Sequence, residues 1–375
     1  GLGANGRLGR SPQTQTSFEP LKDFAETARS VAVAQDHTLI ITASGAVYSF
    51  GLNRFAQLGY TIEQEFGIVA STTAKLGGGA GVTFGQPANA PQVELDIQIS
   101  PRRIVGPLKK EFVLGAACSK LHSVVFTSEG LFTWGTNTGQ LGYDRSGTAV
   151  QIQPRKVTAL AAGSGIQQVA ASDFGTACLM EGGDVFVWHN DTHFRINFPL
   201  ARFSSSISVF RPRQVQPKAL ISKLSSSGNT FAALSDMGDL FTFNLEHPSE
   251  YSSTGTVGRA PAAGGSAAKS SAAQMAPKPQ LLWSVRKKFT AVRDVAIGAD
   301  GSVILCTESG HCFVRPRRSD TGGKGGGGKN FKFQQIPYLQ RVVKVATSES
   351  GALAAIKADP GMRDVRVKGR TVEEA

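Results

Sequence analysis

Two stretches of the chain repeat one pattern. Residues 33–59 read VAQDHTLIITASGAVYSFGLNRFAQLG, and residues 118–142 read CSKLHSVVFTSEGLFTWGTNTGQLG. Each stretch has a His, a Gly eight residues later, an aromatic–Gly pair, an Asn and a closing Gln-Leu-Gly. A repeated unit predicts a fold built from stacked copies, and folds of this kind are common binding platforms.

Weaker copies follow the two clear ones and are found by their turn glycine. The repeat positions are His37, Gly45, Gly51, Asn53 and Gly59 in the first copy, His122, Gly130, Gly135, Asn137 and Gly142 in the second, and Gly183, Trp188, Gly238, Gly310 and Gly361 in the rest. Successive turn glycines are 85, 53, 55, 72 and 51 residues apart. A unit of about 50 residues explains these spacings if two units carry insertions.

Within each unit the apolar residues alternate with a period of two. Residues 38–42 form one such run and 47–50 form the next, with a Gly turn between them. The pattern predicts two antiparallel strands joined by a hairpin. Because strand pairs recur along the chain with little helical periodicity, we expect the blades of a β-propeller.

The number of units predicts the number of blades. Residues 1–9, GLGANGRLG, match the end of one more unit whose strands would precede them. One partial and six fuller units predict an all-β, seven-bladed propeller with an incomplete first blade. We expect one domain over residues 1–370, with units near 1–20, 21–105, 106–157, 158–215, 216–285, 286–340 and 341–370.

Three segments are predicted to be flexible insertions because they are rich in Gly, Ser, Ala or Pro. They cover residues 61–98, 249–280 and 319–330. A second recurrence joins the units: Pro101-Arg102-Arg103, Pro154-Arg155-Lys156 and Pro212-Arg213. Proline at the start of an edge strand loses no ladder hydrogen bond. We therefore interpret these arginines first as structural positions of the repeat.

The formal net charge is +12. Such a charge suits nucleic acid or an acidic partner. Because the basic residues recur at repeat positions, charge spread over a large surface is the favoured interpretation, and nucleic-acid binding is secondary.

The cysteines and the termini bear on compartment. None of the four cysteines forms a C-x-x-C pair, so we expect each thiol to act as a small apolar side chain in a strand. Free thiols favour a reducing compartment, the cytoplasm or the nucleus. We expect no membrane span, because there is no apolar run near 18 residues. The chain begins with Gly and is interpreted as a fragment.

The string G-x-N-x-x-x-Q-L-G after a strand pair, with His before the Gly turn, resembles the repeats of the regulator of chromosome condensation family. The order of segments from GLGANGRLG to VAASDFGTACLMEGGDVFVW also resembles the inhibitor of Bruton tyrosine kinase group. The stronger similarity covers residues up to about 190. Members of that group carry ankyrin repeats, these repeats and BTB domains, which implies a role in an adaptor for a cullin-type ubiquitin ligase.

Few residues suggest chemistry. His37 and His122 could contact a partner or act in catalysis, but a histidine that ties neighbouring strands is favoured. Arg315 stands at an aromatic position of the repeat and could form a basic partner-binding patch with Arg317 and Arg318, or mark a degenerate blade edge. Residues 323–330 nearly spell a phosphate loop, but they lack the final Ser or Thr and a preceding strand.

We find no catalytic, metal or cofactor motif and expect no enzyme. The sequence favours a non-catalytic protein-interaction module. The resemblance implies that its partner is a tyrosine kinase or a ubiquitin-ligase substrate. Two alternatives stay open: a guanine-nucleotide exchange factor for a small GTPase, and a basic chromatin- or RNA-binding propeller.

Overall fold

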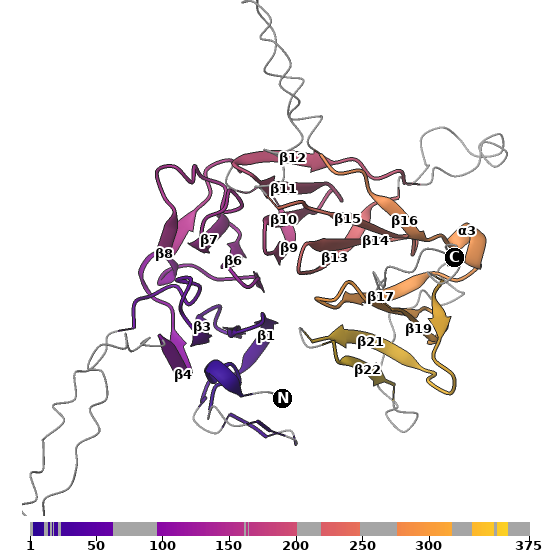
Figure 1. Ribbon diagram of the computed structural model, residues 1–375, viewed down its shortest axis with the longest axis horizontal. Helices are drawn as coiled ribbons and strands as arrows, with labels where there is room; N and C mark the ends of the chain where they lie inside the picture. Colours follow the sequence, from indigo (N-terminus) through magenta and orange to yellow (C-terminus); the bar gives the residue numbers. More distant parts are fainter. Residues whose placement is uncertain are drawn as a thin grey trace, which may run out of the picture.

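The computed structural model describes most of the repeat units. The described residues are 3–10, 14–15, 17, 19–21, 24–62, 96–160, 163, 165–200, 219–247, 276–316, 332–348 and 351–358. In this part of the chain, antiparallel sheets follow one another around a ring (Figure 1). The all-β propeller class predicted from the repeats is confirmed.

Five of the sheets have four strands, and we call them blades A to E in chain order. Blade A contains β1 (Ala28–Val33), β2 (His37–Thr42), β3 (Val47–Leu52) and β4 (Ile97–Arg103). Blade B contains β5 (Gly115–Cys118), β6 (His122–Thr127), β7 (Gly130–Thr136) and β8 (Val150–Lys156). Blade C contains β9 (Ile166–Ser172), β10 (Gly175–Met180), β11 (Val185–His189) and β12 (Thr192–Ile196).

The second half of the ring keeps the same plan. Blade D contains β13 (Ile221–Ser227), β14 (Thr230–Ser235), β15 (Leu240–Asn244) and β16 (Gln280–Trp283). Blade E contains β17 (Val292–Ile297), β18 (Val303–Thr307), β19 (Cys312–Arg315) and β20 (Gln334–Gln335). Sheet F has two described strands, β21 (Val342–Thr347) and β22 (Leu353–Lys357). Three short helices complete the described elements: η1 (Ala4–Gly6), η2 (Gly106–Leu108) and α3 (Val285–Lys288).

The core lies between neighbouring blades. The second strand of each blade is almost entirely buried, and β2 is buried at every position. Between blades A and B, Leu39 and Ile41 meet Phe132 and Trp134. Since each face is covered only by the next blade, the stability of one blade depends on its neighbours.

The first and last sheets lie on either side of the open part of the ring (Figure 1). Here the apolar side chains are not covered by described residues: Val31 and Val33 of β1 are 57% and 63% exposed, and Ile356 of β22 is 58% exposed. The described sheets do not establish the count of seven blades, which stays a prediction, as do the unit limits.

The N-terminal segment 3–10 packs on blade A. Thr38 Oγ1 donates to the Arg7 carbonyl at 3.0 Å, just as Ser123 Oγ of blade B donates to the Gln57 carbonyl at 2.8 Å. Gly9 lies against the Phe50 ring as Gly59 lies against Trp134. The segment therefore occupies on blade A the place that the closing loop of blade A occupies on blade B, consistent with the end of a further unit.

Several sequence predictions fall outside the described residues. They are the bulk of the insertions 61–98 and 249–280, all of 319–330, the Pro212-Arg213 recurrence, Gly361, and both Arg317 and Arg318.

Candidate functional site

The repeat histidines connect one blade to the next. His37 Nε2 lies 2.8 Å from Ser123 Oγ, and His122 Nε2 lies 2.8 Å from Thr176 Oγ1. Both rings are fully buried, and burial lowers the pKa of each to about 3. Each imidazole is therefore neutral near pH 7 and serves as a hydrogen-bonding tie, inaccessible to a substrate.

The two copies differ at one partner of this histidine. In blade B, Ser119 Oγ lies 2.7 Å from His122 Nδ1. Ala34 holds the same place in blade A, since its N–H donates to the His37 carbonyl as that of Ser119 donates to the His122 carbonyl. Among the described residues, His37 Nδ1 consequently has no hydrogen-bond partner, and Gln57 Nε2 beside it in the repeat also has none.

The aromatic–Gly pair allows a close approach of two backbone segments. Gly51 and Gly135 have φ values of 115° and 118°. A Cβ at Gly51 would lie 2.3 Å from the Asp36 carbonyl oxygen, and one at Gly135 would lie 2.5 Å from that of Leu121. Only glycine fits both the conformation and the space.

The repeated pattern of the closing loop is held by its asparagine. Asn53 Nδ2 donates to the Tyr60 carbonyl at 2.8 Å, and Asn137 Nδ2 donates to that of Tyr143 at 3.0 Å.

The buried Trp188 lies in the core between blades B and C. The remaining repeat glycines lie in the hairpin turns or at the ends of the closing loops: Gly45, Gly59, Gly130, Gly142, Gly183, Gly238 and Gly310.

The predicted basic patch is described at one residue only. Arg315 is the last residue of β19 and lies opposite Val303. Its expected companions, Arg317 and Arg318, lie outside the described residues. The partner-binding role of the three arginines remains a prediction.

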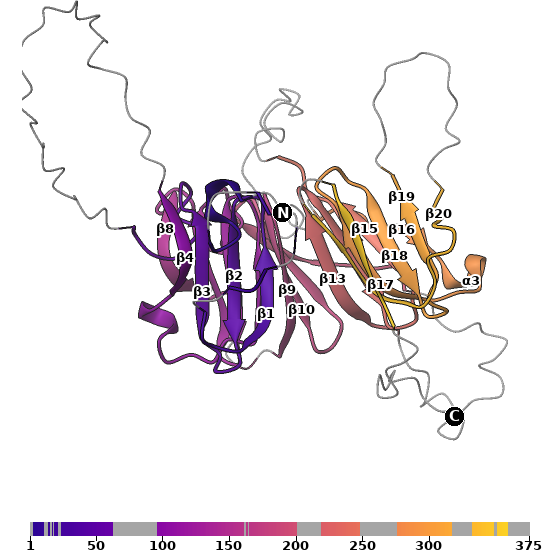
Figure 2. The ribbon, with the colours of Figure 1, turned by 90° about the horizontal axis from the view of Figure 1, so that it is seen from below.

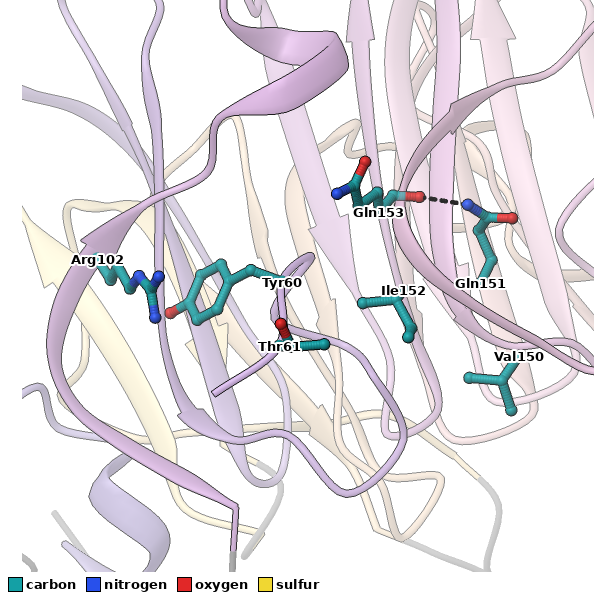
Figure 3. Close-up of a pocket in the computed structure, with 7 residues that line it drawn as sticks. All are labelled: Tyr60, Thr61, Arg102, Val150, Gln151, Ile152 and Gln153. Carbon is teal, nitrogen blue, oxygen red and sulfur yellow. Dashed lines mark hydrogen bonds between the residues drawn. The ribbon is translucent and has the colours of Figure 1, made fainter. Parts of the chain in front are cut away.

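A groove at the outer rim of blades A and B is the candidate site, and we call it the rim groove (Figure 3). It has a volume of about 460 Å³. On the blade A side it is lined by Tyr60, Thr61 and Arg102, and on the blade B side by residues 150–153 of β8.

A cation–π pair forms one wall of the rim groove. The Arg102 guanidinium lies 4.6 Å from the centre of the Tyr60 ring. The Tyr60 hydroxyl donates to the Ser49 carbonyl at 3.0 Å, and burial raises the pKa of this phenol to about 12. The ring is therefore neutral and fixed, and it holds the guanidinium by one face while the N–H groups remain available.

Blade B repeats this pair. Arg155 lies 4.4 Å from the centre of the Tyr143 ring, and the Tyr143 hydroxyl donates to the Thr133 carbonyl at 3.3 Å. In its two described copies the Pro-Arg recurrence thus supplies an arginine that stacks on a buried tyrosine of the same blade.

The opposite wall is partly apolar. Val150 and Ile152 are 52% and 41% exposed. Gln151 Nε2 donates to the Gln153 carbonyl at 2.7 Å, as seen in Figure 3. The seven lining residues include no carboxylate, His or Cys, so the groove offers charge, amide groups and apolar surface for binding.

The sequence analysis did not identify Tyr60, Thr61 or residues 150–153. A usable pattern was present, because Tyr follows the closing Gln-Leu-Gly in both clear copies and Pro-Arg follows each of them further on. Within the described part of the chain, no cluster of three metal-ligating side chains occurs. A search of the same residues finds no helix with the length and apolar character to cross a membrane.

Comparison with curated proteins finds relatives of much greater length. The chain is 28% identical over 363 residues to BTB/POZ domain-containing protein 1 of Schizosaccharomyces pombe, covering 96% of this chain and 24% of that protein. It is 33% identical over 192 residues to inhibitor of Bruton tyrosine kinase of Xenopus laevis, covering 50% of this chain and 12% of that protein. No family model matches the chain.

Comparison with solved structures finds the same fold. Human WBSCR16 matches over 95% of this chain and 84% of its own, with a TM-score of 0.60 and 16% identity. Prp20p of Saccharomyces cerevisiae, described with its binding properties to Gsp1p and histones, matches over 95% of this chain and 77% of its own, with a TM-score of 0.53 and 17% identity. The resemblance to the chromosome-condensation-regulator repeats and to the inhibitor of Bruton tyrosine kinase group is confirmed.

Proposed function

We propose that this chain, a repeat domain of the chromosome-condensation-regulator type, is the partner-recognising propeller of a BTB-containing adaptor. The observation that carries the proposal is the rim groove, where binding groups are presented on a scaffold whose repeat histidines tie neighbouring blades together. Rigid blades that carry exposed loops and edges are suited to recognition.

The names of the relatives support the proposal that the chain belongs to a BTB-containing adaptor. The chain aligns over nearly its full length with a protein named for its BTB/POZ domain. The chain spans about a quarter of that relative, so the activity of a whole protein lies beyond it. We propose that the adaptor serves a cullin-type ubiquitin ligase inside the cell, that the propeller selects the substrate or a kinase partner, and that no bond chemistry occurs in this domain.

A pull-down from nuclease-treated lysate tests this function. The chain is used as bait at low and at moderate salt, and the captured proteins are identified by mass spectrometry. A short set of proteins that survives moderate salt is the expected result. Binding that occurs only in untreated lysate run in parallel, or that is lost at moderate salt, would instead favour the chromatin- or RNA-binding alternative, because phosphate contacts weaken steeply with salt.

Exchange activity on a small GTPase is the second candidate. Its support is the fold similarity to Prp20p, whose structure is described together with binding to Gsp1p. Release of a fluorescent GDP analogue from a panel of small GTPases is the direct assay. Acceleration by this chain at catalytic amounts would replace the adaptor proposal.

A further inference from the structure

We infer that the rim groove binds a short acidic peptide segment of a protein partner, with a carboxylate on Arg102 and an adjacent apolar side chain on Val150 and Ile152. The inference rests on the proposed function as a protein-interaction module and names the chemistry of the partner.

The positive charge of Arg102 indicates that the ligand carries a carboxylate. The structure contains five ion pairs among its described residues, and Arg102 takes part in none of them. Its guanidinium is stacked on Tyr60 and lines the groove. A guanidinium fixed in this way has lost part of its conformational freedom before binding and can receive a carboxylate through two parallel hydrogen bonds.

The exposed apolar residues of β8 indicate that the ligand also carries an apolar side chain. In the register with β7, Gln151 lies opposite Gly135 and Arg155 lies opposite Thr133, so that residues 152–154 share the space of one partner residue. Such a bulge bends the strand and interrupts its pairing. Ile152 lies in the bulged stretch, Val150 lies beside it opposite Thr136, and both are exposed apolar groups at the groove.

The bulge also decides how a peptide binds. An added strand needs a regular edge, and the bulge in β8 interrupts that edge at the groove. The corresponding stretch of β4 is widened in the same way, since Gln98 lies opposite Gly51 and Arg102 lies opposite Ser49. Recognition therefore depends on side chains of the ligand, an acid and an apolar residue close together.

Nucleic acid fits this groove less well. Single strands are held by aromatic faces on which bases stack and by several cations along the backbone. The aromatic ring of the groove is Tyr60, and Arg102 already covers one of its faces. Arg102 is the one cation among the seven lining residues.

Fluorescence anisotropy with the full 375-residue chain tests the inference. The probes are two fluorescein-labelled pools of short peptides, identical except that the central residue is Glu in one pool and Gln in the other, with Leu, Ile or Val at the adjacent positions. We expect the Glu pool to bind and the Gln pool to bind at least about tenfold more weakly.

Matched variants locate the binding. Arg102→Gln is expected to weaken Glu-pool binding by about tenfold, whereas Arg155→Gln, which removes the same charge from the equivalent pair in blade B, should change it by less than about threefold. Ile152→Glu places a negative charge, the same sign as the ligand carboxylate, at the opposite wall and should weaken Glu-pool binding by at least about tenfold. Thermal melts of each variant check that the fold is retained.

Three results would overturn the inference: equal binding of the two pools, equal losses in Arg102→Gln and Arg155→Gln, or tighter binding of a labelled oligouridine probe that Arg102→Gln abolishes. A failure of this inference can be distinguished from a failure of the proposed function. If lysate partners are still captured by Arg102→Gln, the interaction module stands and its contact surface lies elsewhere.

Discussion

Acidification should destabilise the propeller through its two buried repeat histidines. Burial lowers the pKa of His37 and of His122 to about 3, while an unfolded histidine titrates near 6.5. The native state therefore holds both rings neutral at a pH where the unfolded chain binds protons. Their contribution to stability is complete above about pH 6.5 and is lost progressively as the pH falls toward 3.

The magnitude follows from the size of this window. A pH of 5 lies about 1.5 units below the pKa of an unfolded histidine. The unfolding free energy therefore falls by about 2 kcal/mol for one histidine and by about 4 kcal/mol for both. A loss of this size is a large fraction of the stability of an ordinary domain. We expect this loss of unfolding free energy to add to the loss caused by protonation of the carboxylates.

Urea unfolding at pH 7 and pH 5, followed by tryptophan fluorescence, provides the measurement. The quantity compared is the fall in unfolding free energy between the two pH values. His122→Gln should reduce that fall by about 2 kcal/mol relative to the wild type, because the carboxylates contribute equally to both proteins. An unreduced fall in His122→Gln would refute the argument from burial.

Further predictions concern single positions. Ala34→Ser should stabilise the protein by about 1 kcal/mol by giving His37 Nδ1 a partner, and Ser119→Ala should destabilise it by at least as much; chemical denaturation measures both. Gly135→Ala should cost more than about 2 kcal/mol, whereas Gly147→Ala, with no heavy atom within 4 Å of its Cβ, should be nearly neutral in the same assay. Burial raises the pKa of all four thiols, so Ellman's reagent should react slowly in buffer and fully in denaturant with Cys118, Cys178, Cys306 and Cys312.

The sequence predicted the fold better than the site because the two depend on different kinds of information. Alternating apolar residues and turn glycines are local, so the hairpins of the blades could be located from the sequence alone. The structural use of His37 was also predictable, since burial follows from its position in an apolar strand.

The rim groove depends on contacts between distant segments. Tyr60 and Arg102 are separated by a long insertion, and residues 150–153 belong to the next unit. Nothing local in the sequence shows that these three segments meet. Their counterparts Tyr143 and Arg155 lie much closer together in the chain, and the recurrence of this Tyr and of Pro-Arg in both copies is the signal that could have located the pair.

The closing loops have a consequence for biosynthesis. The loop of blade A docks on blade B through the Gln57 carbonyl, which accepts from Ser123 and from the Trp134 indole N–H, and segment 3–10 docks on blade A in the same sense. Each docking surface thus leaves the ribosome after the loop that covers it. At these two joins the covering loop is already synthesised when its blade emerges, so we expect translation from the N-terminus to favour docking of each blade on the preceding loop.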